Sequence, residues 1–394
     1  MGVFQNSLMA GAASISGDET YVLWAWGEAS DGSNGLGNNT TYSSPVQIGS
    51  LNDWTPCICT DGNSTHAIKS DGTLWGWGRG DMLGNGTNTN KSSPIQIGSA
   101  TDWYAVFCAA TAECHWAINT SGELWTWGNN TEGMLGVGSL TNYSSMVQVA
   151  GTTWAAACSG VNHTIAVKTD GTLWGWGSGQ FGRSFHNSQT DYSSPVQCGT
   201  DTTWWGSSDY PPSGGWESGV EAQKVFGQHQ NGGGDSLVID TNGKLWATGL
   251  NLYGGTGLPE YNLSPQQVGT STDWTHKEMG KYSGCGVNDG AFFTWGGPNS
   301  GGSLGNGTKS FTKGTLYEWD TGTATGAAYT NGAAPYDHSF ANFSGTLYGS
   351  GESSHGQAGN GTTTNTSSPV QGPGTTDWTK IIGGSYNFIA IKPG

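Results

Sequence analysis

Carboxylates and histidines are the side chains in this chain that could do acid–base chemistry, and most of the carboxylates that stand out recur at equivalent places. Four aspartates each stand directly before a tryptophan: Asp53, Asp102, Asp273 and Asp377. Three others each precede a glycine in a short turn sequence: Asp71, Asp170 and Asp289. General acid–base catalysis needs carboxylates that are set apart in role and environment. Because they recur at equivalent places, we interpret these seven of the 29 acidic residues as structural parts of a repeat and not as catalytic groups.

Metal ligands and nucleophiles are equally hard to find. Six of the eight histidines follow no metal-ligand spacing: His66, His115, His186, His229, His276 and His355. The Ser43-Ser44 pair and its copies lack the Gly-x-Ser-x-Gly setting of a nucleophile elbow. The Gly-Asn-Gly loops carry too few acids for a calcium cage. We therefore predict a non-enzymatic protein with no cofactor and no metal site.

The composition excludes several classes of protein. Only 34% of the residues are hydrophobic and 11% charged, whereas glycine occurs 68 times and tryptophan 20 times. Such a chain is too poor in charge for a soluble helical protein and too aromatic for a disordered one. The net charge is 13 − 29 = −16, and Arg79 and Arg183 are the only arginines. Nucleic acids and anionic membranes are bound mainly through Lys and Arg, so both are excluded as partners.

The cysteines and the N-terminal residues indicate the cellular compartment in which the protein is made. The cysteine count is seven, an odd number without zinc-type spacing, and a disulfide framework is not expected. The first lysine is Lys69, so the N-terminal residues lack the basic start of a secretory signal. No apolar run approaches the ~20 residues of a membrane span. We expect a protein that is made in a cytoplasm and is not inserted in a membrane.

One small unit is repeated along almost the whole chain. The run Ser70-Asp71-Gly72-Thr73-Leu74-Trp75-Gly76-Trp77-Gly78 returns nearly unchanged at 169–177. Each unit combines an aromatic-Gly segment, a Gly/Asn loop, a Ser-Ser-Pro segment, an Asp-Trp or Thr-Trp pair and a short apolar segment. Seven aromatic anchors mark the copies: Trp24, Trp75, Trp125, Trp174, Trp246, Phe293 and Tyr348. About four short strands in ~50 residues is the size of a propeller blade, so residues 21–394 predict an all-β, seven-bladed β-propeller.

The two ends of the repeat region complement each other. The chain stops at Lys392-Pro393-Gly394, where other copies turn into the aromatic-Gly strand, and the unmatched strand stands at 21–27. We predict that 386–392 pairs with 21–27 and closes the ring, which removes exposed sheet edges.

These repeats resemble the regulator of chromosome condensation repeat family. The resemblance rests on the Trp-Gly, Gly-x-Leu-Gly-x-Gly, Pro-Val and His-x-x-Ala-Val elements and covers roughly residues 21–394. It implies a seven-bladed β-propeller, in which His163 and His338 hold the place of a recurrent histidine that bonds to a neighbouring strand.

The family resemblance allows several functions. Uniform repeats of this kind occur in proteins similar to bacteriophage structural proteins. That likeness implies a virion component on a tail, fibre or capsid surface, present in many copies or as a homo-oligomer. Such a component would contact a virion neighbour or a host receptor, and a glycan is a second candidate target. The alternative is a secreted propeller that binds and inhibits an enzyme, as a β-lactamase inhibitor of this type does. A third role, nucleotide exchange on a small GTPase, uses basic segments that this chain lacks.

The departures from the repeat are where we place partner binding. The fourth unit is roughly twenty residues longer than the others, and insertions in repeat proteins commonly lie on a binding face. Its aromatic and turn residues form the candidate contact site: Trp205, Tyr210, Pro211, Pro212, Trp216 and Glu217. The sixth unit is irregular, with 311–313 in place of Ser-Ser-Pro.

Residues 1–20 precede the repeats. They are mildly apolar and too few to fold alone. We predict a docking arm that contacts a neighbouring molecule through Val3, Phe4, Leu8 and Met9.

Overall fold

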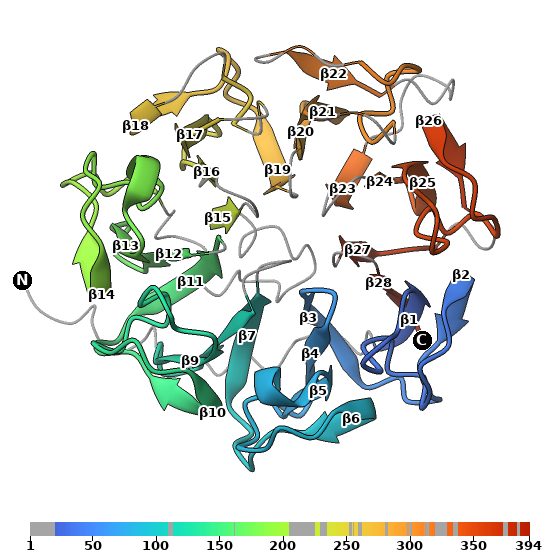
Figure 1. The fold of residues 1–394 in the computed structure, drawn as a ribbon, viewed down its shortest axis with the longest axis horizontal. Helices are drawn as coiled ribbons and strands as arrows, with labels where there is room; N and C mark the ends of the chain where they lie inside the picture. Colours follow the sequence, from blue (N-terminus) through green and yellow to red (C-terminus); the bar gives the residue numbers. More distant parts are fainter. Residues whose placement is uncertain are drawn as a thin grey trace, which may run out of the picture.

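The computed structural model is an assembly of short antiparallel strands arranged around a centre (Figure 1). The residues that the structure describes are 20–108, 113–160, 162–204, 225–228, 235–251, 254, 256–258, 262–279, 283–297, 299, 302–310, 312, 315–319, 329–333, 338–372, 377–383 and 387–394. Within them the chain forms 28 strands and two short 3₁₀ turns.

The first three blades follow the chain in order, each running from the innermost to the outermost strand. Blade 1 comprises β3 (Trp54–Thr60), β4 (Ser64–Lys69), β5 (Leu74–Gly78) and β6 (Lys91–Gln96). Blade 2 comprises β7 (Trp103–Cys108), β8 (Cys114–Asn119), β9 (Leu124–Gly128) and β10 (Tyr143–Gln148). Blade 3 comprises β11 (Trp154–Ser159), β12 (His163–Lys168), β13 (Leu173–Gly177) and β14 (Tyr192–Gln197). The turns η1 (Gly80–Met82) and η2 (Gln180–Gly182) follow β5 and β13.

The next three blades repeat this plan. Blade 4 comprises β15 (Val225–Gln228), β16 (Asp235–Ile239), β17 (Leu245–Gly249) and β18 (Asn262–Gln267). Blade 5 comprises β19 (Trp274–Met279), β20 (Ser283–Asn288), β21 (Ala291–Gly296) and β22 (Leu316–Glu318). Blade 6 comprises β23 (Tyr329–Ala333), β24 (His338–Phe343), β25 (Thr346–Gly351) and β26 (Thr366–Gln371).

Blade 7 is built from both ends of the repeat region. Its inner strands are β27 (Lys380–Gly383) and β28 (Asn387–Pro393), and its outer strands are β1 (Tyr21–Gly27) and β2 (Tyr42–Gln47). Strands β1 and β28 pair antiparallel from Tyr21 opposite Pro393 to Gly27 opposite Asn387. The predicted pairing of the first and last strands is therefore confirmed, displaced by one residue at the C-terminal strand.

The sheets follow one another around the centre. Blades 1 and 7 are linked into one eight-stranded sheet by a single pair, Tyr21 opposite Trp54. The other five sheets have four strands each, so the described residues form seven four-stranded units. The innermost strands contact one another in the cyclic order β3, β7, β11, β15, β19, β23, β27 and back to β3. The predicted all-β propeller fold is confirmed.

Burial within a blade explains the recurring sequence. The second strand of each blade is almost wholly buried, as in β4 and β8, because both of its faces contact neighbouring blades. The Ser-Ser-Pro segment forms the outermost strand, in which each pair of half-buried residues is followed by an exposed one. Proline has no N–H to donate and therefore suits this edge.

A tryptophan clamp joins each of four blades to the blade before it. The second tryptophan of the aromatic-Gly strand is fully buried and donates its indole N–H to a loop carbonyl of the preceding blade. The pairs are Trp26 with Gln357 (3.2 Å), Trp77 with Ser33 (2.9 Å), Trp127 with Met82 (2.7 Å) and Trp176 with Met134 (2.8 Å). In blades 4 and 6, Thr248 and Ser350 make the corresponding bonds, to the carbonyls of Gly182 and Gly302.

Blade 5 corrects the predicted irregularity. Its outer strand lies at 316–318 and pairs with β21, so the replacement for Ser-Ser-Pro is this segment and not 311–313. Trp319, next to this strand, is buried edge-on against Phe292 and donates to the carbonyl of Leu304. This indole packs within its own blade, which the sequence spacing did not reveal.

The clamp predicts unequal costs for two glycine substitutions. Gly136 and Gly199 both have positive φ, +71° and +67°, but a Cβ on Gly136 would lie 2.6 Å from Trp176 Nε1, whereas one on Gly199 meets nothing within 4 Å. We expect Gly199→Ala to lower the free energy of unfolding by about 1 kcal/mol through backbone strain. Gly136→Ala should cost about 2 kcal/mol more, because the indole must move. Urea denaturation of both variants measures the difference, and equal losses would contradict the clamp.

Candidate functional site

The residues predicted for partner binding cannot be placed. The loop residues Trp205, Tyr210, Pro211, Pro212, Trp216 and Glu217 and the arm residues Val3, Phe4, Leu8 and Met9 all lie outside the described residues. Their roles stay predictions. The described residues offer two other places where polar side chains gather: the interface between blades 1 and 2, and a cleft between blades 4 and 5.

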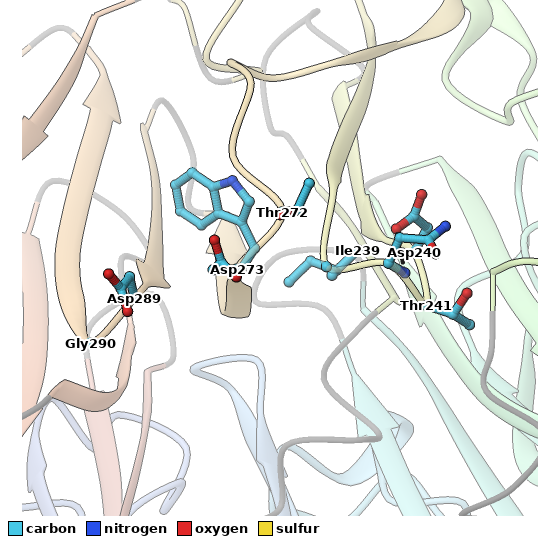
Figure 2. Close-up of a pocket in the computed structure, with 10 residues that line it drawn as sticks. Ile239, Asp240, Thr241, Thr272, Asp273, Asp289 and Gly290 are labelled. Carbon is cyan, nitrogen blue, oxygen red and sulfur yellow. Dashed lines mark hydrogen bonds between the residues drawn. The ribbon is translucent and has the colours of Figure 1, made fainter.

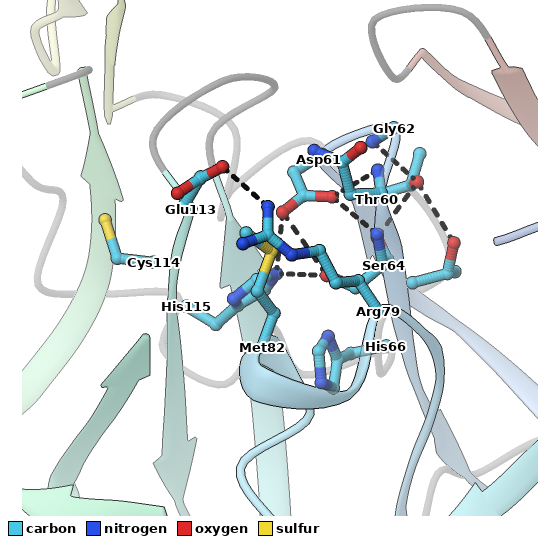
Figure 3. Close-up of polar contacts among 12 residues, drawn as sticks. Thr60, Asp61, Gly62, Ser64, His66, Arg79, Met82, Glu113, Cys114 and His115 are labelled. Atoms are coloured by element: carbon cyan, nitrogen blue, oxygen red, sulfur yellow. Dashed lines mark hydrogen bonds and ion pairs between the residues drawn. The ribbon is translucent and has the colours of Figure 1, made fainter. Parts of the chain in front are cut away.

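A serine, a histidine and an aspartate meet between blades 1 and 2 (Figure 3). Ser64 Oγ lies 3.0 Å from His115 Nε2, and Asp61 Oδ2 lies 3.4 Å from the same nitrogen. Asp61 also accepts hydrogen bonds from the backbone N–H groups of Asn63 and Ser64. The three residue types are those of a hydrolytic triad, so their geometry decides what they can do.

The geometry excludes a triad. In a Ser-His-Asp triad the serine and the aspartate bind opposite imidazole nitrogens, whereas here both approach Nε2 of His115. The His115 and Asp61 side chains are at most 1% exposed, so no substrate reaches them.

Burial sets the charge states of this cluster. It lowers the pKa of His115 to about 3 and raises the pKa of Asp61 to about 6. At neutral pH the imidazole is neutral and stacks on Trp127, with ring centroids 5.6 Å apart. The cluster is therefore a hydrogen-bonded joint between blades and not a reactive site.

The same joint recurs around the ring. The first residue of a blade's second strand contacts the second residue of that strand in the next blade. His163 Nε2 lies 2.7 Å from Ser236 Oγ, and the His338 ring packs edge-on against Phe388, with centroids 5.0 Å apart. The bond predicted between His163 and a neighbouring strand is confirmed, whereas His338 makes an aromatic contact in its place.

Sequence spacing missed one proximity. His66 and His115 follow no metal-ligand spacing in the sequence, but their ring centroids lie 4.6 Å apart. The packing of blade 1 against blade 2 places the third residue of β4 beside the second residue of β8. Within the described ranges, no group of three or more His, Cys, Asp or Glu residues could hold a metal ion.

Both arginines are engaged within the protein. Arg79 spans the outer side of the Asp61 cluster and pairs with Glu113 at 2.8 Å and Asp81 at 2.9 Å (Figure 3). Arg183 is 4% exposed and donates to the carbonyl of Gln180. Neither arginine is free to form a basic docking patch.

Lysine side chains lie between paired tryptophans on the side of the propeller that carries the turns between second and third strands. In blade 1, Lys69 Nζ lies 4.2 Å from the Trp75 ring centroid and 5.0 Å from that of Trp54. Asp53 completes the group, with a carboxylate oxygen 3.0 Å from the ammonium. Lys168 of blade 3 and Lys392 of blade 7 lie over their own tryptophan pairs in the same way.

A cleft opens between blades 4 and 5 on the same side (Figure 2). Its volume is about 590 Å³ and its walls are the turn 239–243 of blade 4, residues 272–274 at the start of β19, and the turn at 289–290. Three aspartates are among its lining residues, Asp240, Asp273 and Asp289, together with Trp274. Asp240 is 4% exposed and accepts hydrogen bonds from Trp246 Nε1 and two backbone N–H groups. No lysine or arginine is among the residues that line this cleft.

The fold is a propeller of repeated blades, and buried polar side chains form hydrogen bonds between neighbouring blades. Models of the regulator of chromosome condensation (RCC1) repeat match residues 121–167 and 155–183. The chain therefore contains RCC1 repeats within its β-propeller. No curated protein matches its sequence.

Solved structures share the fold at low sequence identity. Human WBSCR16 is 15% identical with a TM-score of 0.76, over 95% of this chain and all of that one. Prp20p from Saccharomyces cerevisiae is 16% identical with a TM-score of 0.73, over 96% of this chain and 92% of that one. Yeast Prp20 bound to Kap60 is 16% identical with a TM-score of 0.75, over 95% and 89%. The described part of the chain contains no helix long and apolar enough to cross a membrane.

The buried histidines predict an acid-sensitive fold. Burial lowers the pKa of His338 from 6.5 to about 3, so between these values the unfolded chain binds a proton that the folded chain does not. Stability from this residue is fully present above pH 6.5 and is lost as the pH falls toward 3. We expect His338→Phe, which keeps the ring contact with Phe388, to reduce the loss of unfolding free energy between pH 7 and 4.5 by about 2 to 3 kcal/mol. Urea denaturation at both pH values measures it, and parallel curves for the two proteins would contradict the assignment.

Proposed function

We propose that this chain is a non-catalytic, protein-binding propeller on the surface of a bacteriophage virion, as a tail, fibre or capsid accessory protein. Its partner would be a virion neighbour or a host receptor, with a glycan as the second candidate target. The observation that carries the non-catalytic part is the use of reactive side chains as joints. Ser64, His115 and Asp61 are buried between blades, and His163 bonds to the next blade.

Protein binding is supported by what similar propellers do. The Prp20p structure is described with its binding properties to Gsp1p and histones, and a second Prp20 structure is bound to Kap60. A set of blades arranged around a centre presents two faces of loops, and such loops suit recognition. We transfer to this chain only the capacity to bind a protein.

The virion assignment is supported by the cysteines and by the uniform repeats. All seven cysteines are free and buried, as expected for a chain made in a reducing cytoplasm. Burial raises the pKa of Cys57 to about 11, so this thiol would stay protonated and unreactive outside the cell. The near-identical Ser-Ser-Pro segments are the feature on which the expected likeness to bacteriophage structural proteins rests.

Mass spectrometry of purified phage particles from the genome that encodes the chain tests this proposal. We expect the protein in particles in many copies. Absence from particles, together with a soluble monomer that captures a single enzyme, would overturn the virion role in favour of the secreted inhibitor. Release of labelled nucleotide from a small GTPase, measured in parallel, should not be accelerated.

We further propose that residues 1–20 attach the propeller to the particle and that the 205–217 loop contacts the external partner. Deletion of residues 1–18 should abolish incorporation into particles and leave the melting temperature unchanged. A double variant, Trp205→Ala with Trp216→Ala, serves as the matched control and should be incorporated normally but attach less well to host cells. Normal incorporation of the deletion variant would refute the docking arm.

A further inference from the structure

Three blades of this protein hold a lysine ammonium in the same setting. In blades 1 and 3 the lysine stands opposite the inner-strand tryptophan, Lys69 opposite Trp54 and Lys168 opposite Trp154. The ammonium lies over that ring and over the anchor tryptophan of the same blade. In blades 1 and 7 the aspartate before the inner tryptophan adds its carboxylate, at 3.0 Å for Asp53 and 3.9 Å for Asp377. Aromatic faces and a carboxylate together stabilise an alkylammonium ion.

Blade 5 has the same aromatic and acidic groups, but an asparagine stands in the position that the lysine holds in blades 1, 3 and 7. Asn288 stands opposite Trp274, in the register position of Lys69, and donates to Ser271 Oγ at 2.6 Å. The rings of Trp274 and Phe293 lie 5.8 Å apart at 61°, close to the 6.0 Å between Trp54 and Trp75. Asp273 precedes Trp274 as Asp53 precedes Trp54.

Blade 4, which lies beside the Trp274 site of blade 5, has an acidic residue where blades 1, 3 and 7 have a lysine. The residue in the lysine position is Asp240, which lines the cleft together with Asp273 and Asp289 (Figure 2). Trp274 is a further lining residue. Asp289 is held at the cleft by a tight Asp-Gly turn in which both residues have positive φ, +46° and +75°. Three carboxylates with no lysine or arginine in the cleft lining give this opening a negative potential.

We propose that this cleft binds an alkylammonium group, as carried by a lysine side chain of a partner protein, in the place that an internal lysine fills in blades 1, 3 and 7. The proposal rests on the protein-binding function proposed above and names the chemistry of one contact. The incoming ammonium would lie over Trp274 and beside Asp273, with Asp240 and Asp289 adding long-range attraction. No covalent step is involved.

Blade 2 differs in a way that supplies a control. It also has an asparagine in the lysine position, but Asn119 donates to Glu123 Oε2 at 2.8 Å. The preceding blade places Lys69, a cation, at the position that Asp240 holds beside blade 5. We therefore do not expect the Trp103 region to bind an ammonium ion.

Fluorine NMR of the full chain labelled with 5-fluorotryptophan tests the site directly. The Trp274 resonance is assigned by Trp274→Phe, and the probe is N-acetyl-lysine methylamide titrated through the millimolar range, where a single ammonium contact is measurable. We expect the Trp274 signal to shift with this probe and not with its ε-acetylated, neutral analogue. The shift should weaken as salt is raised, because the attraction is electrostatic.

Two variants, each with a matched control in blade 2, test whether the ammonium binds at the Trp274 site. Asn288→Lys should place a lysine in the site as in the sister blades, abolish the shift and leave the melting temperature equal or higher. Asp273→Asn should weaken binding at least tenfold, whereas Asn119→Lys and Asp102→Asn should leave it unchanged. An unmoved Trp274 signal, or unchanged binding in Asn288→Lys, would overturn the proposal. Tighter binding of tetramethylammonium than of the lysine probe would overturn the assignment to a protein lysine.

The failure of this inference is distinguishable from failure of the proposed function. If the chain is found in particles and Asp273→Asn leaves attachment to hosts and neighbours intact, the cleft is not the contact but the binding function stands. If the lysine probe shifts Trp274 in a chain that is absent from particles, the cleft assignment stands without the virion role.

Discussion

The clamp between a buried indole and the loop of the preceding blade is the interaction on which the rest of the structure depends. Each of these indoles gives its N–H to a carbonyl, and in each case a glycine of the same loop, such as Gly35 under Trp77, leaves space for the ring. A buried N–H without an acceptor is costly, so the bond fixes how far one blade rotates against the next. Seven repeats of one rotation set the width of the ring and the register in which its side chains meet.

The way neighbouring blades meet commits the polar side chains of the interior to hydrogen bonds between blades. Because the second strands of neighbouring blades meet with an offset of one residue, polar side chains on these strands face one another and must bond there. Ser64 and His115 meet for this reason, and so do His163 and Ser236. A serine, a histidine and an aspartate close together are ordinarily grounds to suspect hydrolysis. Here their shared nitrogen and complete burial make them a joint, and function is left to the two faces.

Repetition made the fold predictable from the sequence, and the same repetition limited what could be predicted of the site. The anchors at Trp24 and Trp75 fixed the blade period, and the unmatched ends at 21–27 and 386–392 gave the pairing of the last blade. Contacts between blades were beyond reach, because the rotation that brings His66 beside His115 is a property of packing and not of spacing. The outer strand of blade 5 was misplaced because Leu316–Glu318 carries no Ser-Ser-Pro signal.

A departure from a repeat is informative only when the physical role of the repeated residue is known. Lysine at the end of the second strand looks like a solvated charge until its ammonium is found between two indoles, where it shields them and pairs with aspartate. Against that rule, Asp240 and Asn288 in adjacent blades are more than sequence drift. Asp240 reverses the charge and lines the cleft. Asn288 puts an amide in the lysine position opposite Trp274, and Trp274 lines the same cleft. In a ring of similar blades, this face position joins a reversed charge in blade 4 to an asparagine in the lysine position of blade 5, and such a difference between blades is what recognition of a single partner group requires.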